Sequence, residues 1–157
     1  TGKQIHKFEG HTNYALGVSW RHDGKQIASC GADDKVMIWD IKTGDRLRTI
    51  QGFKKQVFAV KFIGQKNVTV ACAGDRTLRM HNSDNGSVVR SFSGGGSDYL
   101  YSLDITPNGE ILVAGSHDGI LRIWNGTQNN SQPLKTIKPP QTEPPEAGRV
   151  SSVEGGR

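Results

Sequence analysis

The sequence has little cysteine, no long apolar run and no cluster of positive charge. Its two cysteines, Cys30 and Cys72, show no metal-type spacing, and free cysteines of this kind are commonly small buried apolar residues, which favours a reducing compartment such as the cytoplasm. No apolar stretch approaches the roughly 18 residues that cross a bilayer, and 22% of the residues are charged. These features argue against a membrane protein and against a charged disordered tail.

Positive charge exceeds negative charge without being concentrated. The 20 Lys and Arg against 15 Asp and Glu give a net charge of +5, but the longest basic run is Lys54-Lys55. A nucleic-acid surface needs a clustered patch, so we expect a solvated surface and no nucleic-acid or membrane partner. Glycine is abundant: its 20 residues raise the apolar share from 34% to about 47%, which is enough for the core of one domain or of part of a larger one.

A repeat of 42 to 43 residues dominates the sequence. The segment 35–40 (KVMIWD) recurs as 77–82 (TLRMHN) and as 120–125 (ILRIWN), and Asp33, Asp75 and Asp118 align in the same register. Within the first unit, segments 15–20, 26–30, 36–41 and 46–50 are rich in β-branched and aromatic residues and are separated by turn residues. The pattern predicts three units of four strands each.

The period, the Gly10-His11 pair and the Trp39-Asp40 pair resemble the WD-repeat β-propeller family, whose blades span about 40 to 45 residues. The resemblance implies an all-β fold of propeller blades with four antiparallel strands, three of them complete in this chain. We expect an outer strand at 1–9, blade one at 10–51, blade two at 52–93 and blade three at 94–138, all within a propeller segment at 1–138.

The resemblance also implies a hydrogen-bonded set of four side chains within a blade. Carried over by position, blade one has the complete set, blade two keeps one member and blade three keeps two. The complete set is His11, Ser29, Asp33 and Trp39, and the partial sets are Asp75 in blade two, and Asp118 and Trp124 in blade three. We expect each Asp to accept backbone N–H groups in a tight turn, and we expect blade two to be the less stable one.

His11, Ser29 and Asp33 are also the residue types of a catalytic triad. The resemblance implies that they interlock to stabilise the blade, so no catalytic residue is assigned. His81 occupies the Trp position of blade two and is interpreted as a packed substitute, because no second ligand stands at metal spacing. No haem or phosphate-binding motif occurs, so no metal or cofactor is predicted.

The two ends suggest that three blades are not the whole ring. Residues 139–148 contain a proline cluster typical of a stiff linker, and 149–157 resemble the start of a further blade. Propellers have about 4 to 8 blades, so the outer faces of a three-blade wedge need covering. Two hypotheses remain: further blades of a longer parent chain complete the ring, or a second copy does.

A rigid blade scaffold with variable loops suggests a non-catalytic protein that binds a protein or peptide partner through its loop face. In the resembled family this face carries the starts of the first strands and the turns after the second strands. The corresponding candidates are Tyr14, Gln56, Tyr99 and His117, the two tyrosines being the strongest. The alternatives are an excised or engineered fragment that assembles into a ring without its own ligand, and the propeller part of a larger enzyme or redox protein.

Overall fold

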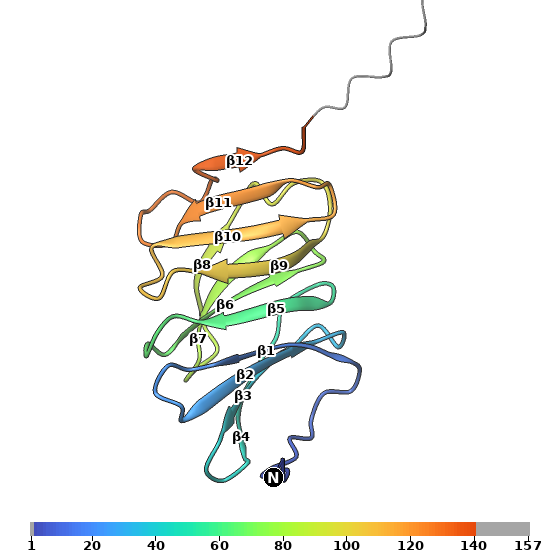
Figure 1. Ribbon diagram of the computed structural model, residues 1–157, viewed down its shortest axis with the longest axis vertical. Coiled ribbons are helices and arrows are strands. Elements are labelled where there is room, and N and C mark those ends of the chain that lie inside the picture. Colours follow the sequence, from blue (N-terminus) through green and yellow to red (C-terminus); the bar gives the residue numbers. More distant parts are fainter. Residues whose placement is uncertain (1, 141–157) are drawn as a thin grey trace, which may run out of the picture.

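The computed structural model describes residues 2–140, and within them every regular element is a β-strand (Figure 1). The strands form three sheets of four antiparallel strands each, so the predicted all-β fold of four-stranded blades is confirmed. The predicted further blade at 149–157, and all but two residues of the predicted linker, lie outside the described residues. Within the described part of the chain, no helix has the length and apolarity needed to span a membrane.

Blade one contains β1 (Ala15–Trp20), β2 (Gln26–Gly31), β3 (Val36–Asp40) and β4 (Arg46–Ile50), paired in sequence order. The turns between its strands begin where the β-branched segments end. Gly24 and Gly44 have φ of 70° and 82° in two of these turns, a left-handed conformation that suits a residue without a Cβ.

The other two blades repeat this order (Figure 1). Blade two contains β5 (Val57–Phe62), β6 (Val68–Ala73), β7 (Leu78–Asn82) and β8 (Val88–Phe92). Blade three contains β9 (Leu100–Ile105), β10 (Ile111–Ser116), β11 (Leu121–Asn125) and β12 (Lys135–Ile137). Every blade therefore has its own fourth strand, and strands that follow one another in a blade pair antiparallel, with a register shift in the first pair of each blade.

The hydrophobic core lies between blades rather than within one. Ile38 of blade one packs in a buried cluster with Val60 and Phe62 of blade two. A second buried cluster joins Leu78 of blade two to Trp124 of blade three. Alternate residues of a strand point to opposite faces of its sheet, so the middle blade contributes to both clusters. Blade one also buries Met37 and Trp39 on its other face, in a smaller third cluster against which Phe8 packs.

The two cysteines lie in these cores. Cys30 belongs to the first cluster and Cys72 to the second, and both are unbonded thiols. Burial raises the pKa of each thiol to about 12, so both remain protonated near neutral pH. They act here as small apolar residues.

The leading segment differs from the expected outer strand at 1–9. Residues 2–9 pair with no strand of the three described sheets, and Ile5 is 87% exposed. The physical reason is that a strand needs a neighbouring strand for its backbone hydrogen bonds, and each described blade already has four. Phe8 instead packs on the outer face of blade one, where its ring lies 5.5 Å from that of Trp39.

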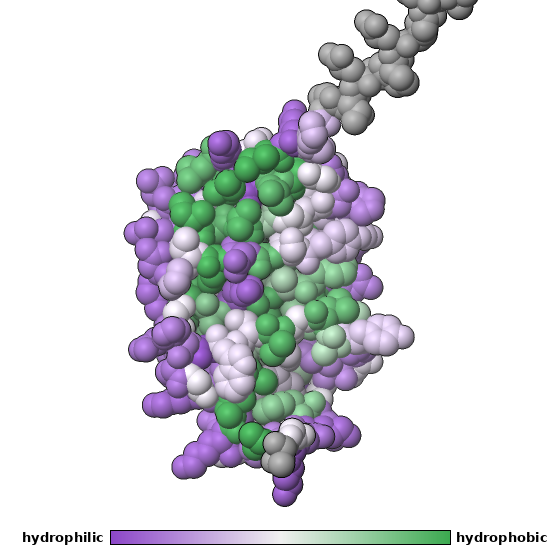
Figure 2. Space-filling model, viewed as in Figure 1, coloured by the Kyte–Doolittle hydropathy of each residue, from purple (hydrophilic) through white to green (hydrophobic). Residues whose placement is uncertain are grey.

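Apolar side chains remain exposed on both end blades. Val18 and Trp20 of β1 are exposed on blade one, and Leu121 and Ile137 on blade three. Figure 2 shows apolar residues gathered along the middle of this view, from the blade-three end to the blade-one end, with hydrophilic residues on both flanks. The exposed apolar side chains of β1 on blade one and of β11 and β12 on blade three make the outer faces of these two blades partly apolar.

Candidate functional site

The four-residue set of blade one forms one continuous chain of hydrogen bonds. The Trp39 indole Nε1–H donates to Ser29 Oγ at 2.8 Å, and Ser29 Oγ lies 2.8 Å from His11 Nε2. His11 Nδ1 lies 2.9 Å from Asp33 Oδ1. A carboxylate only accepts, so the hydrogen bond to Asp33 places a proton on His11 Nδ1; in that neutral tautomer Nε2 is the acceptor for the serine hydroxyl. Every polar atom along this chain therefore has a partner.

Asp33 joins this set to the turn before β1. Its second oxygen, Oδ2, accepts the Thr12 backbone N–H at 3.1 Å. Burial pushes the pKa of Asp33 upward, but the hydrogen bonds from His11 and Thr12 outweigh it, so the pKa lies below its usual value. The carboxylate thus stays charged and connects the turn after β2 to the turn before β1.

Ser29, His11 and Asp33 match the spacing of a nucleophile, a base and an orienting acid, but Ser29 serves a structural bond as well. Its oxygen accepts the indole hydrogen of Trp39, which is itself buried. Withdrawing that lone pair weakens the serine as a nucleophile. The arrangement is therefore suited to stabilising the blade.

Blade two replaces the same set by aromatic packing. Phe53 and His81 occupy the His and Trp positions, with ring centroids 5.4 Å apart, and Ala71 removes the hydroxyl between them. His81 is buried, and neither of its ring nitrogens has a hydrogen-bond partner among the described residues. Burial, with a further contribution from the Arg79 charge, lowers the pKa of His81 to about 4. The imidazole is therefore neutral at pH 7.

The Asp of blade two holds its turn by different partners. Asp75 Oδ1 accepts the Thr77 N–H at 3.1 Å, and Oδ2 accepts the Lys54 N–H at 3.0 Å. Arg79 reaches Asp75 Oδ2 at 3.4 Å and donates to the Gly52 carbonyl at 2.7 Å. The arginine thus bridges the two loops that the histidine bridges in blade one.

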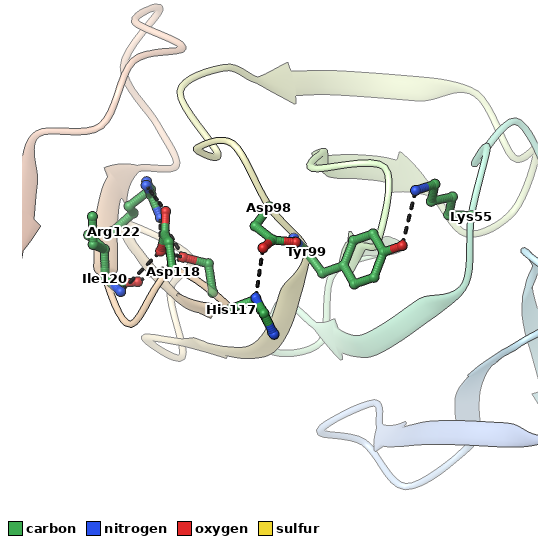
Figure 3. A network of polar contacts seen from close by, with 8 residues as sticks. Lys55, Asp98, Tyr99, His117, Asp118, Ile120 and Arg122 are labelled. Atoms are coloured by element: carbon green, nitrogen blue, oxygen red, sulfur yellow. Dashed lines mark hydrogen bonds and ion pairs between the residues drawn. The ribbon is translucent and has the colours of Figure 1, made fainter.

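Blade three also pairs an arginine of its third strand with the turn carboxylate, and with shorter contacts than in blade two (Figure 3). Arg122 donates to both oxygens of Asp118, at 2.6 Å to Oδ2 and 3.1 Å to Oδ1, and Asp118 also accepts the Ile120 N–H at 3.0 Å. The Arg122 hydrogen bonds hold the pKa of Asp118 far below its usual value, against the opposing effect of burial. With Ala114 in place of the serine, Trp124 Nε1 donates to the Ser93 carbonyl at 2.9 Å.

The repeat pattern of the sequence does not identify Arg79 and Arg122 as site residues. They occupy equivalent third-strand positions, 43 residues apart, where blade one has Met37. The available signal was an arginine on an otherwise apolar strand in the two units that lack the histidine. The partner of such an arginine can be assigned only when it is known toward which face of the sheet its side chain points.

The predicted partner-binding residues lie on the loops at one edge of the blades. Tyr14 is 78% exposed, Gln56 and His117 are exposed, and Tyr99 is half-buried. Tyr99 and His117 are brought together through Asp98, whose Oδ2 lies 2.7 Å from His117 Nδ1 and whose Oδ1 accepts the Tyr99 N–H (Figure 3).

Aromatic packing extends this loop surface. The Tyr101 ring lies between those of Phe58 and His117, with centroid separations of 4.7 and 5.9 Å, and it also contacts the Tyr99 ring. No described aromatic ring packs on Tyr14. The structure therefore places Tyr99 and His117 in one cluster and leaves Tyr14 as a separate exposed ring.

A cavity of about 560 Å³ opens on this face between blades two and three. It is formed by the loops β4–β5, β6–β7 and β8–β9, and we call it the loop-face cavity. Its lining residues are Lys54, Lys55, Gly74, Asp75, Arg76, Thr77, Arg79, Ser97, Asp98 and Tyr99. Gln56 lies in an adjoining cavity of about 360 Å³ that shares Lys54, Lys55 and Tyr99 with it.

The sequence model of the family described as "WD domain, G-beta repeat" matches residues 2–40 and 86–125 of this chain, about half of its length. The chain belongs to the WD-repeat family. The two matched spans end at β3 and β11, which carry Trp39 and Trp124. The unmatched span between them includes β7, where His81 replaces the tryptophan, so the family model and the side-chain geometry agree on which WD repeat is atypical.

Two of the three relatives named here are described as WD repeat-containing proteins. The chain is 26% identical over 120 residues to the WD repeat-containing protein 26 homolog of Arabidopsis thaliana, and 31% identical over 124 residues to the Periodic tryptophan protein 2 homolog of Dictyostelium discoideum. It is 27% identical over 129 residues to the WD repeat-containing protein 82 of Drosophila melanogaster. These matches cover 74%, 77% and 81% of this chain.

The same matches cover only 20%, 13% and 40% of those relatives, so the WD-repeat chain spans a minor part of each. WD-repeat proteins are in general non-catalytic scaffolds that bind protein partners. This general role belongs to the family as a whole and does not identify a partner-binding surface on this chain.

Proposed function

We propose that this chain is part of a non-catalytic WD-repeat scaffold that binds a protein or peptide partner through its loop face. The observation that carries the proposal is the loop-face cavity, which lies where Tyr99 and His117 come together and which adjoins the cavity containing Gln56. Cavities lined by aromatic and polar groups are the usual places where ligands bind.

The two candidate tyrosines support the proposal in different ways. Tyr99 is held by packing against Phe58 and Tyr101, so little side-chain entropy is lost when a partner covers it. Tyr14 is exposed without such support, and it offers a large amphipathic area that proteins commonly use at interfaces. Tyr99 would therefore make a rigid contact with a partner, and Tyr14 a more adaptable one.

The proposal is tested by immobilising the chain and two variants, Tyr14→Ala and Tyr99→Ala, and comparing the proteins that each retains from an extract. Leu47→Ala is the matched control, because Leu47 is an exposed apolar residue on β4, away from the first-strand starts. We expect at least one protein to be retained by the parent chain and the control and lost from a tyrosine variant. An unchanged set of retained proteins would contradict the loop-face assignment.

A second proposal concerns the two end faces: we propose that they are blade-to-blade interfaces, covered by further blades of a longer chain. Val18 on blade one occupies the position that Val60 holds on blade two, where it is buried against blade one. An equivalent residue on an equivalent strand face is expected to have an equivalent neighbour.

Light scattering after gel filtration tests this second proposal. The isolated 157-residue chain is expected to self-associate through its uncovered faces, and Val18→Glu is expected to reduce that association. A discrete dimer would favour a ring closed by a second copy instead. A well-folded monomer of 17.1 kDa would overturn both versions.

A further inference from the structure

The loop-face cavity carries an excess of positive charge. Four of its lining side chains are cationic and two are anionic, a difference of +2; the cations are Lys54, Lys55, Arg76 and Arg79, and the anions are Asp75 and Asp98. The chain has no longer basic run than Lys54-Lys55, so this concentration arises because three loops far apart in sequence meet.

The two carboxylates of the cavity are already engaged. Asp75 accepts the backbone N–H groups of Thr77 and Lys54 and pairs with Arg79. Asp98 accepts the Tyr99 N–H and pairs with His117. Both groups hold the loops in place and have little capacity left to neutralise the other cations.

Three cations remain without a carboxylate partner among the described residues. Lys54 and Arg76 are exposed and form no described side-chain hydrogen bond or ion pair. Lys55 donates only to the Tyr99 hydroxyl, at 3.1 Å, and lies over the same ring, 4.6 Å from its centroid (Figure 3). An anionic ligand would therefore find three unneutralised cations around one cavity.

We propose that the loop-face cavity binds an acidic, Asp- or Glu-rich segment of the protein partner, with its carboxylates placed between Lys54, Lys55 and Arg76. This inference rests on the proposed function and names the chemistry of the partner. Carboxylates spaced along an extended peptide match separated cations, and opposite charges across an interface raise the association rate and select against wrong partners.

Two features favour an acidic peptide over a nucleic acid. Lys55 lies over the Tyr99 ring and the Tyr101 ring meets it in an edge-type contact, which leaves less of the Tyr99 ring open for a base to stack on. The three unpaired cations stand around one cavity and form no continuous basic track along the surface, which suits a few separate carboxylates better than a phosphate backbone.

The test is an NMR titration of the ¹⁵N-labelled chain with hexaglutamate and, as the neutral control, hexaglutamine. We expect hexaglutamate alone to shift backbone signals of residues 54–56, 74–77 and 97–99, with binding that weakens as salt is raised. The variant Lys54→Gln/Arg76→Asn should weaken binding roughly two- to thirtyfold, from about 0.2–1 kcal/mol per exposed ion pair. Asparagine is chosen at position 76 because it tolerates the left-handed backbone found there, with φ of 67°.

The matched control is Lys42→Gln/Lys66→Gln, which removes the same charge from exposed turns at the opposite edge of the blades. It should bind hexaglutamate as the parent chain does. Equal weakening by both variants would mean a net-charge effect and would overturn the proposal. Hexathymidylate and a phosphoserine peptide are titrated in the same way. The proposal would also be overturned if hexathymidylate bound more tightly than hexaglutamate, or if the phosphoserine peptide bound and hexaglutamate did not.

Failure of this inference is distinguishable from failure of the proposed function. If hexaglutamate does not bind but the tyrosine variants still lose a retained protein, the loop face binds a partner of another chemistry. If neither effect is seen, the loop face is not the binding surface.

Discussion

Arg122 and Asp118 form a two-bond ion pair in blade three, with Nη2–Oδ2 and Nη1–Oδ1 distances of 2.6 and 3.1 Å. Arg122 is 6% exposed, so the Asp118 carboxylate offsets the free-energy cost of burying its positive charge. Histidine performs the corresponding task in blade one, where His11 pairs with Asp33. The equivalent turn is thus held by an arginine in blade three and by a histidine in blade one.

Replacing Arg122 by methionine, the residue type of blade one at this position, should lower the free energy of unfolding by about 3 kcal/mol, because Asp118 is left without its counter-charge. Urea denaturation would measure this. Arg48→Met, at an exposed position on β4, is the control. Adding Asp118→Asn should recover part of the loss; an effect no larger than that of Arg48→Met would show that the pair contributes little.

Ser29→Ala should destabilise blade one by about 1–3 kcal/mol, since it removes the acceptor of the Trp39 indole and the donor to His11 Nε2 together. Ser91→Ala, at an exposed position on β8, removes a hydroxyl with no described partner and should be close to neutral. Chemical denaturation of the two variants compares them directly. Equal stability would contradict the structural role of the hydrogen-bonded chain.

His81 should make the protein sensitive to mild acid. Its pKa is about 4 in the folded state and about 6.5 when unfolded, so between these values the unfolded state binds more protons. The stability present above pH 6.5 is therefore lost as pH falls toward 4, by about 3 kcal/mol in total. Unfolding free energies measured from pH 7.5 to 4 would show this slope.

His81→Phe should remove that slope, because it keeps an aromatic ring against Phe53 and has no group to protonate. His22→Gln is the control, since it removes an imidazole from an exposed turn. A slope that survives in His81→Phe would mean that other groups cause the acid sensitivity.

Asp34 adopts φ of 63° directly after the turn carboxylate Asp33, and Gly119 occupies the equivalent position in blade three with φ of 75°. Asp34→Gly should raise the unfolding free energy by about 0.5–1 kcal/mol by relieving the left-handed strain. Asp34→Ala should lower it by a similar amount, because alanine has neither the freedom of glycine nor a local hydrogen bond to offset the strain. Thermal denaturation of Asp34→Gly and Asp34→Ala should show a higher melting temperature for the first variant and a lower one for the second, relative to the parent chain.

Repetition made the blades predictable from the sequence. The offsets of 42 and 43 residues align three sets of strand segments, and the strands at 15–20, 36–40 and 46–50 lie where β-branched and aromatic residues alternate. The register also located Asp33, Asp75 and Asp118 in their turns. Local signals suffice here because each strand pairs mainly with the next one along the chain.

The leading segment and the two arginines were not predictable in the same way. Residues 2–9 have the alignment of an outer strand, but a strand forms only where another supplies its hydrogen bonds. Arg79 and Arg122 look like ordinary strand residues until the sheet faces are known. Their pairing with Asp75 and Asp118 depends on how the third strand approaches the turn.

The repeat in the sequence predicts the three blades of the described residues and the strands within them, and the family resemblance adds the four side chains of blade one. The packed structure is needed to see how blades two and three replace those side chains, and which loops meet to form the positively charged cavity. These residues are far apart along the chain: the loops that carry Lys54 and Arg76 meet within blade two, and Tyr99 of blade three reaches them only after the two blades pack through their apolar faces, which no local sequence pattern records.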